Sequence, residues 1–447
     1  MNILYVSQYF LPEVCAPATR VNEFTQAWAR AGHNVRVLTG FPNHPEGVLH
    51  PDYLEKWKRG FAREDYAGVE VSRTWLLPAA NRGVWGRAVN YSSFALSATM
   101  AGPFVAQRRG VVIGTSPQLL VGAASYVVAR SRRLPFVFEV RDLWPQSIVA
   151  VGAAGRRSAL YRSLEQVANY LYRHADRIVL DGEAKRRQLV AMGVSPEKTA
   201  VIRNGVSEDF CLEPDSVVAH ATRERVRNEL GLGRKFIAMY IGTLGMAHGL
   251  ETVLQAAERL KVRPDIVFLI IGEGAEREQL LKKREELFLS NVLFLRKQPR
   301  EAIPAYLAAA DVCLAPLRNR EVFKTAIPSK MFEAMAAGKP VILGVEGEAK
   351  EILLDAKAGI PVPPENLKAL ADAVMLLHDK QGLSHEMGLS GRRAVCQKYS
   401  RQQQAADYLD LLEELTRVPS DRLPHAFRWA LKIRSKEAPK VSTSKSS

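Results

Sequence analysis

Basic side chains gather in one loop of the second half of the chain, where they could bind an anionic ligand. The loop "LAPLRNREVFKTAIPSK" (residues 314–330) carries Arg318, Arg320, Lys324 and Lys330 just ahead of a predicted helix. Cations beside a helix N-terminus suit a diphosphate, because the helix dipole and its free N–H groups already favour an anion. The loop therefore predicts a phosphate-binding site.

Two glycine-rich turns follow predicted strands in the same half. "YIGTLGMAHGLETV" (240–253) places Gly242, Gly245 and Gly249 between a strand and a helix, and "IIGEG" (270–274) follows the next strand. Glycine lets the backbone approach a phosphate closely, and the helix N-terminus can hold it. Many strand–helix turns carry glycine, so these turns alone do not assign a function.

A carboxylate, Glu333, lies within the apolar helix predicted from "PSKMFEAMAAGKPVI" (328–342). Burying an acid is costly unless a partner satisfies it. Glu333 follows Lys330 by three residues and could accept hydrogen bonds from the hydroxyls of a ribose. The alternative is a simple ion pair with Lys330 or Lys339 on a solvated helix face.

The elements that position these residues are strands and helices in alternation. Strands are predicted at 2–9, 34–40, 111–116, 135–140 and 177–181, and again at 235–242, 265–272, 292–296, 311–317, 340–345 and 359–363. Their apolar runs are continuous, which indicates parallel sheets covered by helices on both faces. The predicted class is α/β with two Rossmann-like, doubly wound domains, and such sheets bind ligands beyond the carboxyl ends of their strands.

The length of 447 residues suits two domains better than one core. We predict an N-terminal domain at 1–207 and a C-terminal domain at 208–397, with the turn at Asn204-Gly205 close to the boundary. An amphipathic helix at 398–418 is expected to pack back on the first domain. Residues 419–447 are predicted to form a basic amphipathic segment and a disordered tail.

Positive charge is concentrated in the first half and the tail. The net charge is +11 for residues 1–205, −1 for 206–420 and +5 for 421–447. This asymmetry suggests contact with an anionic surface, and we expect a membrane, because no motif of a nucleic-acid-binding protein is present. Residues 88–107 lack charge and are interpreted either as a core helix or as a helix lying in a bilayer surface; 422–436 is a second interfacial candidate.

The cysteines and the N-terminal residues indicate the cellular compartment in which we expect the protein. The four cysteines are scattered without metal-ligand spacing, so we expect free thiols and no metal site. "MNILYVSQYF" is typical of a first strand rather than a signal peptide. The expected location is cytoplasmic and peripheral on the inner face of the plasma membrane.

Several stretches together make the chain resemble the retaining glycosyltransferases of the GT-B fold, family 4, and within it the WbuB-like subgroup of amino-sugar (L-fucosamine) transferases. The resemblance covers residues 1 to about 415. The stretches that carry it are "YFLPEVCAPATR" (9–20), "TSPQLLVGAA" (115–124), "EVRDLWPQS" (139–147), "IRNGV" (202–206), "YIGTLGMAHGLETVLQAA" (240–257) and "IPSKMFEAMAAGKPVI" (327–342).

The resemblance implies a UDP-sugar donor held by the C-terminal domain and a lipid-linked saccharide acceptor held by the N-terminal domain. It further implies transfer with retention in the cleft between them, without a metal or cofactor. Glu333 matches the family's ribose-binding acid. The catalytic residues expected are Arg141, Asp142 and Lys330, and the acceptor-binding residues are Glu13, Ala18 and Arg20. The donor-binding residues expected are Arg203, Asn204, Gly242, Thr243, Leu244, His248, Gly249, Gly272, Gly274, Lys324, Thr325, Ser329, Lys330 and Glu333.

The chain departs from the family pattern at three places. Thr325 stands where the first acid of the family's E-x7-E pattern would fall. Thr243 and His248 occupy the positions of the usual arginine and lysine of the diphosphate loop, and Arg141 replaces a histidine before Asp142. We expect other cations, namely Lys324, Lys330 or Arg203, to supply the missing charge.

A second hypothesis places a different reaction on the same architecture. A UDP-N-acetylglucosamine 2-epimerase-like isomerase would bind the same nucleotide, but it would need neither a lipid acceptor nor a basic, apolar first domain. The sequence does not predict the sugar, the linkage or the oligomeric state.

Overall fold

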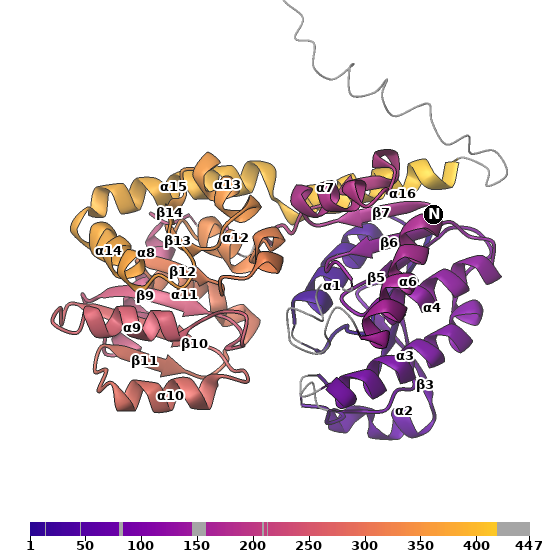
Figure 1. Ribbon diagram of the computed structural model, residues 1–447, viewed down its shortest axis with the longest axis horizontal. Helices are drawn as coiled ribbons and strands as arrows, with labels where there is room; N and C mark the ends of the chain where they lie inside the picture. Colours follow the sequence, from indigo (N-terminus) through magenta and orange to yellow (C-terminus); the bar gives the residue numbers. More distant parts are fainter. Residues whose placement is uncertain are drawn as a thin grey trace, which may run out of the picture.

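The computed structural model describes residues 1–13, 15–44, 46–79, 84–144, 158–207, 210–211 and 213–417. Two α/β domains lie side by side and are joined by short connections (Figure 1). Each has a central, mainly parallel sheet with helices on both faces, and a final helix returns to the first domain. The predicted fold class is confirmed.

The first domain contains an eight-stranded sheet in the order β3-β4-β2-β1-β5-β6-β7-β8. All neighbours are parallel except β3, which runs antiparallel to β4 at the edge. The strands are β1 (Asn2–Val6), β2 (Asn34–Gly40), β3 (Phe61–Tyr66), β4 (Val69–Thr74), β5 (Val111–Thr115), β6 (Phe136–Val140), β7 (Arg177–Leu180) and β8 (Thr199–Val201). The helices are α1 (Ala16–Arg30), η1 (Pro51–Tyr53), α2 (Leu54–Lys58), α3 (Val84–Val105), α4 (Leu119–Ser131), α6 (Ala159–His174), α7 (Glu183–Ala191) and η2 (Pro196–Lys198).

The second domain contains a six-stranded, fully parallel sheet in the order β11-β10-β9-β12-β13-β14. Its strands are β9 (Phe236–Ile241), β10 (Ile266–Ile271), β11 (Val292–Leu295), β12 (Val312–Pro316), β13 (Val341–Gly344) and β14 (Gly359–Pro361). Its helices are α8 (Val217–Glu229), α9 (Glu251–Arg259), α10 (Arg277–Glu286), η4 (Arg300–Ala302), α11 (Ile303–Ala309), η5 (Glu321–Thr325), α12 (Ser329–Ala336), α13 (Glu348–Asp355), α14 (Leu367–Asp379) and α15 (Gln381–Lys398).

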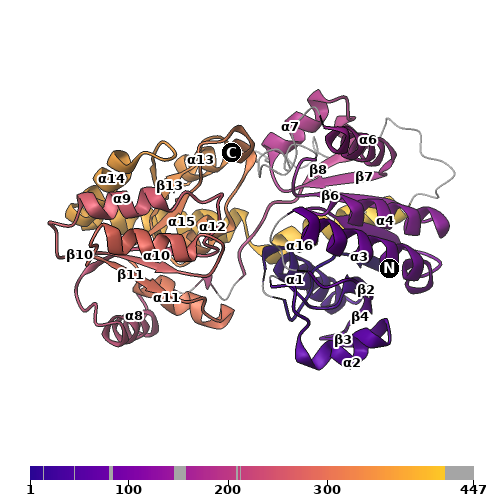
Figure 2. The ribbon, with the colours of Figure 1, turned by 60° about the horizontal axis from the view of Figure 1, so that its bottom comes forward.

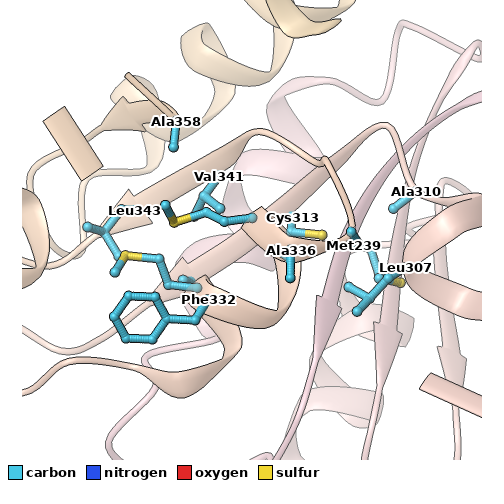
Figure 3. Close-up of a cluster of buried hydrophobic side chains, with 14 of the residues drawn as sticks. Met239, Leu307, Ala310, Cys313, Phe332, Ala336, Val341, Leu343 and Ala358 are labelled. Atoms are coloured by element: carbon cyan, nitrogen blue, oxygen red, sulfur yellow. The ribbon is translucent and has the colours of Figure 1, made fainter. Parts of the chain in front are cut away.

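Helix α12 is anchored in the core of the second domain. Its residues Phe332 and Ala336 are completely buried and share a hydrophobic cluster with Met239 of β9, Cys313 of β12 and Leu343 of β13 (Figure 3). Burial of this face fixes α12 against the sheet. The same packing decides where the polar residues of α12 lie.

The last described helix, α16 (Arg401–Arg417), belongs to the first domain in space (Figures 1 and 2). The chain crosses between domains beside Val206, which pairs with Ser400 in a parallel bridge. The indole N–H of Trp28 on α1 then donates to the Ala405 carbonyl at 2.8 Å, and the Trp28 and Tyr408 rings meet edge to face at 5.3 Å. The returning helix is therefore an integral part of the first core.

Some elements differ from the expectations. The edge strand β3, its neighbour β4 and the short strand β8 were not predicted, because their apolar runs are short or mixed with charges. Residues 88–107 fall largely within α3. Within the described ranges, no helix combines the length and apolar character needed to cross a bilayer. The segment 422–436 lies outside the described residues.

Candidate active site

Neighbouring strand ends of the second sheet bring the predicted glycine turns together. β9 leads into Gly242, and β10, its neighbour, leads into Gly272 and Gly274. The Gly242 N–H donates to the Ile271 carbonyl at 3.0 Å, which ties the first turn to the end of β10. On the other side of β9, β12 leads through a loop to α12. The sheet edge therefore unites the three loops singled out by sequence.

Glycine is required where these loops approach one another. Gly242 has φ +148°, and a Cβ there would lie 3.0 Å from the ammonium nitrogen of Lys330. Gly274 has φ +158°, and a Cβ there would overlap the Leu244 carbonyl. A side chain at either position would strain the backbone and fill the space above the turn.

Lys330 reaches the Gly242 turn from α12. Its ammonium donates to the Tyr240 hydroxyl at 2.7 Å and lies 3.9 Å from the centre of the Tyr240 ring. The Tyr240 hydroxyl in turn donates to the Thr243 carbonyl at 2.6 Å. This chain of contacts holds the cation beside the strand end, with donor capacity left for a ligand.

The environment of the turn makes Lys330 responsive to an anion. Burial lowers the pKa of Lys330 to about 7, against the opposing charge of Glu333. Burial, and then the charge of Lys330, lowers the pKa of His248 to about 3, so this imidazole is neutral. A bound phosphate would restore the charge of Lys330, because an opposite charge favours the ammonium form. Lys330, rather than His248, is the cation at the turn.

Glu333 lies one turn further along α12 and is half-buried. Among the described residues, no hydrogen bond or ion pair to its carboxylate is formed. The expected alternative partners bind elsewhere: Lys330 contacts Tyr240, and Lys339 donates to the Ala308 carbonyl at 2.9 Å. Burial raises the pKa of Glu333, while the charges of Arg300 and Lys330 lower it. The carboxylate is thus available for a ligand.

The other residues expected around the donor have different surroundings. Lys324 is exposed and pairs with Glu321 at 2.6 Å within η5, while Thr325 bonds the Val322 carbonyl. Thr243 is exposed, Leu244 is completely buried, and Ser329 is the first residue of α12. The structure therefore brings Lys330, but not Lys324, to the Gly242 turn.

Arg318, a basic residue of the loop before α12, holds the glycine loops in place. Its guanidinium donates to the Met246 carbonyl at 2.6 Å and to the Glu276 carboxylate at 3.0 Å. Its side chain also packs against Gly249, where a Cβ would lie 3.3 Å from Arg318 Cγ. These contacts indicate a positioning role.

Arg203 and Asn204 lie at the crossing between the domains. Arg203 donates to Glu348 of α13 at 3.2 Å, and Asn204 accepts from Arg20 at 3.0 Å. Glu348 is buried and also accepts the backbone N–H groups of Glu183 and Ala184 at 2.9 and 2.7 Å, at the start of α7. A carboxylate of the second domain thereby caps a helix of the first, which couples the two domains.

A second contact joins the domains on the side of α1. Arg300 of η4, in the second domain, pairs with Glu23 of α1 at 2.5 Å and lies 3.5 Å from the Thr19 hydroxyl. Arg401 also pairs with Glu23. The charge of Arg300 also lowers the pKa of Glu333 on α12, so one guanidinium acts on residues of both α1 and α12.

Arg141 and Asp142 follow β6 in the first domain. The Ser116 hydroxyl accepts both backbone N–H groups, at 2.9 and 3.3 Å, and Lys185 donates to the Arg141 carbonyl. Asp142 is exposed, whereas Nε of Arg141 is buried without a hydrogen-bond partner among the described residues. Burial raises the pKa of the Cys15 thiol, just before α1, and the charge of Arg141 partly opposes this rise. Their backbone is fixed, and their catalytic roles stay predictions.

The residues expected to bind the acceptor are largely enclosed. Arg20 is 4% exposed; it pairs with Glu139 at 2.5 Å and donates to the carbonyls of Ile202 and Arg203. Ala18 is also buried. Contact with an acceptor would require Arg20 to give up these bonds, so its position favours a structural role.

Glu13 differs from Arg20 because it retains an unused atom. Its Oε1 accepts the backbone N–H groups of Asn43 and His44 at 3.0 and 2.9 Å, but its buried Oε2 has no partner in the described part of the chain. Burial raises the pKa of Glu13 to about 7. The carboxyl group anchors the loop after β2, and an acceptor contact stays a prediction.

Sequence reasoning missed a small pocket at the start of α3. Its lining includes Tyr9, His44, Asn90 and Tyr91. Asn90 donates to Asn43 at 3.0 Å and accepts from Gln8 at 2.5 Å. The pocket is closed in this structure, because Tyr9 and Asn90 are only 6% and 4% exposed. Both amide hydrogens of Asn90 are already used, by Asn43 and by the Leu77 carbonyl. The sequence offered little signal, because α3 also carries Ser92, Ser93, Ser97 and Thr99 beside Asn90 and Tyr91.

Tyr240 and Glu348 were also missed. Tyr240 is the penultimate residue of an apolar strand, and only its place before the glycine turn could have marked it. Glu348 follows Gly347 as the first residue of α13, a common position for an acid, so its contact with the other domain left no local signal.

Two family models match the chain. The model described as "Glycosyl transferase 4-like domain" covers residues 16–205, and the model described as "Glycosyl transferases group 1" covers residues 222–394. The first spans most of the β1–β8 domain and the second most of the β9–β14 domain. Each match therefore coincides with one sheet of the fold.

Relatives and solved structures agree with this pattern. The chain is 27% identical over 385 residues to the "Putative colanic acid biosynthesis glycosyl transferase WcaI" of Escherichia coli (strain K12), which covers 84% of this chain and 91% of the relative. It is 27% identical over 269 residues to the "Probable glycosyltransferase WbjE" of Pseudomonas aeruginosa, a match that covers 59% of this chain and 65% of the relative.

The solved structures are similar in fold. Anabaena Alr3699/HepE in complex with UDP has a TM-score of 0.65 at 16% identity, covering 93% of this chain and 100% of that one. WaaG, "a glycosyltransferase involved in lipopolysaccharide biosynthesis", has a TM-score of 0.66 at 16% identity, and the match covers 91% of this chain and 99% of the WaaG chain.

Proposed function

We propose that this chain, whose two domains match the glycosyl transferase 4-like and glycosyl transferases group 1 models, is a GT-B glycosyltransferase. It moves a sugar from a nucleoside-diphosphate donor to a lipid-linked saccharide acceptor with retention. The proposed reaction belongs to the synthesis of bacterial surface polysaccharides, as the names of the colanic acid relative and the lipopolysaccharide structure suggest. The donor proposed is a UDP-linked N-acetylated amino sugar of the kind used by the WbuB-like subgroup.

The observation that carries the proposal is the position of Lys330 beside the Gly242 turn. Tyr240 holds the Lys330 ammonium over the strand end, and the carboxylate of Glu333 lies one helical turn away. These two groups suit the diphosphate and the ribose of a nucleoside diphosphate. Lys330 would bind the diphosphate, and Glu333 would accept hydrogen bonds from the ribose hydroxyls. This arrangement would replace the cations that Thr243 and His248 do not supply.

The chemistry proposed is displacement on the donor face. The acceptor hydroxyl oxygen bonds to the anomeric carbon as the bond from that carbon to the diphosphate oxygen breaks, and a diphosphate oxygen takes the hydroxyl proton. Negative charge therefore grows on the leaving diphosphate. Lys330 and the N–H groups of the glycine turns would stabilise that charge without a metal. The protein otherwise holds donor and acceptor in position.

Both domains contribute to this reaction in the proposal. The acceptor would bind to the first domain near the pocket of Tyr9, His44 and Asn90, and the donor to the second. The interdomain contacts of Glu348 and Arg300 would hold the two substrates in register. A peripheral position on the cytoplasmic face of the plasma membrane would give access to a lipid-linked acceptor.

Product analysis tests the proposal. The purified protein is incubated with single UDP- and GDP-sugars, with and without a bacterial lipid extract, and the products are identified by mass spectrometry. We expect a lipid-linked saccharide extended by one N-acetylated amino sugar, with release of UDP and an α-linkage when the donor is α-linked. Conversion of the donor to an epimer without lipid would instead establish the isomerase, which the family matches do not favour.

A further inference from the structure

Helix α3 of the first domain presents a large apolar face to solvent. Its outward side chains are spaced by four or seven residues and are 44–84% exposed: Trp85 (84%), Val89 (44%), Leu96 (65%), Met100 (67%) and Phe104 (81%). This spacing places them on one side of a helix. From Trp85 to Phe104 the row extends roughly 28 Å along the axis. The exposed Ser92 interrupts the row between Val89 and Leu96, so its continuous apolar part runs from Leu96 to Phe104. Large apolar side chains exposed on successive turns mark an interaction surface rather than scattered exposure.

The inward side of the same helix is already used by the protein. Phe94, Ala98 and Val105 are completely or almost completely buried in the core between α3, α4 and the sheet. Both sides of α3 therefore carry large apolar side chains, although only the inward side is needed for folding. Stability of the domain does not account for the outer row.

The charges around the outer row are positive. No acidic residue occurs anywhere in α3, whose one charged residue is Arg87, and the exposed Arg108 and Arg109 follow its end. An isologous dimer that paired two antiparallel α3 helices would bring the arginines of one copy towards those of the other, with no acid on either helix to offset them. A surface bearing anionic headgroups over an apolar layer is complementary to both features.

We propose that the outer face of α3 is a membrane-docking surface that inserts into the interfacial layer of a bilayer containing anionic lipids. Met100 and Phe104 enter the acyl boundary, while Arg108 and Arg109 contact headgroup phosphates. Asn90 and Tyr91, at the other end of the helix, line the pocket next to Tyr9. The docked helix therefore holds that pocket close to the lipid surface; the significance of this for an acceptor rests on the proposed function, whereas lipid contact itself does not.

A site-specific probe tests the docking surface in the full chain. Met100→Cys, in a background where the exposed Cys396 is replaced by serine, is labelled with an environment-sensitive fluorophore and mixed with phosphatidylcholine vesicles with or without 30% phosphatidylglycerol. We expect a blue shift and increased emission with the anionic vesicles. The matched control is Val217→Cys, at an 84% exposed position on α8 of the other domain, which should show neither change. Vesicle binding without a signal from position 100 would overturn the proposal.

Vesicle flotation adds a quantitative test. The triple variant Leu96→Gln/Met100→Gln/Phe104→Gln should bind anionic vesicles at least tenfold more weakly than the wild type, whereas Val217→Gln/Val218→Gln should not differ from it. Arg108→Gln/Arg109→Gln should lose roughly 30-fold on anionic vesicles and nothing on neutral ones. Circular dichroism and UDP binding check that each variant is folded.

The outcomes separate docking from catalysis. Equal flotation of the α3 variant and the wild type, or a wild-type dimer that the α3 variant converts to a monomer in the absence of lipid, would overturn the membrane assignment. Transfer to a detergent-solubilised acceptor that persists in a non-floating α3 variant would support docking as a separate property. Lipid binding without any sugar transfer would refute the proposed function and leave the docking surface standing.

Discussion

Lys330→Met removes the ammonium group beside the Gly242 turn and keeps a side chain of similar length and apolar character. The ammonium group of Lys330 donates one hydrogen bond to the Tyr240 hydroxyl at 2.7 Å, and its remaining N–H groups can donate to a ligand. The substitution leaves the Tyr240–Thr243 hydrogen bond in place. The fold should therefore survive, and the loss should be confined to binding of the diphosphate.

The size of the effect depends on pH. A hydrogen bond from a charged donor contributes about 1.5–3 kcal/mol, so UDP should bind roughly 10- to 150-fold more weakly to the variant when wild-type Lys330 is charged. The pKa of Lys330 is lowered to about 7 by burial, so the ammonium form prevails below pH 7 and is lost above it. Binding of UDP raises that pKa and takes up a proton. The wild-type affinity should consequently fall by up to about tenfold per pH unit between pH 7 and the pKa of the complex.

Calorimetry at pH 6.5, 7.5 and 8.5 measures this directly. In buffers with different ionisation enthalpies, the wild type should take up close to one proton per UDP bound near pH 8, and Lys330→Met should take up none. Uridine, which lacks the diphosphate, should bind the two proteins equally. Lys324→Met is the matched control, because Lys324 is exposed and pairs with Glu321, and it should bind UDP like the wild type.

Turnover provides the second readout. Lys330→Met should lower kcat by a larger factor than it weakens uridine binding, because charge develops on the leaving diphosphate. A variant that binds UDP with wild-type affinity and keeps its pH dependence would refute the reasoning. The diphosphate would then lie away from the Gly242 turn.

Four further substitutions test the surrounding structure. Glu333→Gln should weaken binding of uridine and UDP alike by about 1.5–3 kcal/mol in calorimetry, and an unchanged affinity would remove Glu333 from the ribose site. Gly242→Ala should weaken UDP but not uridine, because the Cβ would lie 3.0 Å from the Lys330 ammonium; equal loss for both ligands would point to general misfolding. Glu348→Ala removes the cap of α7 and should lower the free energy of unfolding, measured with denaturant, by about 1–3 kcal/mol. The range of domain arrangements detected by small-angle scattering should also widen. Wild-type values in both measurements would show that the cap does not couple the domains. Arg20→Met removes the cation that pairs with the buried Glu139, which keeps only the Tyr5 hydroxyl as a side-chain donor, and should destabilise the protein by about 3–5 kcal/mol. Normal stability with a raised acceptor KM would restore Arg20 to the acceptor site.

The sequence by itself determined the fold class and pointed to the sheet edge at which we propose that the nucleotide binds. Continuous apolar strands alternating with helices leave few alternatives to parallel sheets, because both faces of each strand must be buried. The glycines at 242 and 274 marked the turns, since only glycine tolerates the close backbone approach found there. Glu333 stood out because an acid inside an apolar helix needs a partner.

Only the tertiary structure decided which side chains meet. Sequence left Lys324, Lys330 and Arg203 as candidates for the cation, of which only Lys330 was also predicted to be catalytic, and the packing of α12 brought Lys330 to Tyr240, 90 residues earlier in the chain. Arg20, which was expected to bind the acceptor, is buried in the first domain and pairs with Glu139 from a distant strand. Such contacts depend on how helices dock on sheets, and the local pattern of residues does not encode the docking.

The same limit explains helix α3. Its residues are apolar on both sides, and sequence left a core helix and a bilayer-surface helix as alternatives. The fold buries one side of the helix, with Phe94 in the core, and leaves apolar side chains such as Phe104 (81% exposed) on the other; contact of that side with a bilayer is our proposal. Periodicity reports which residues share a side of a helix, but only the packed structure reports which side the protein covers.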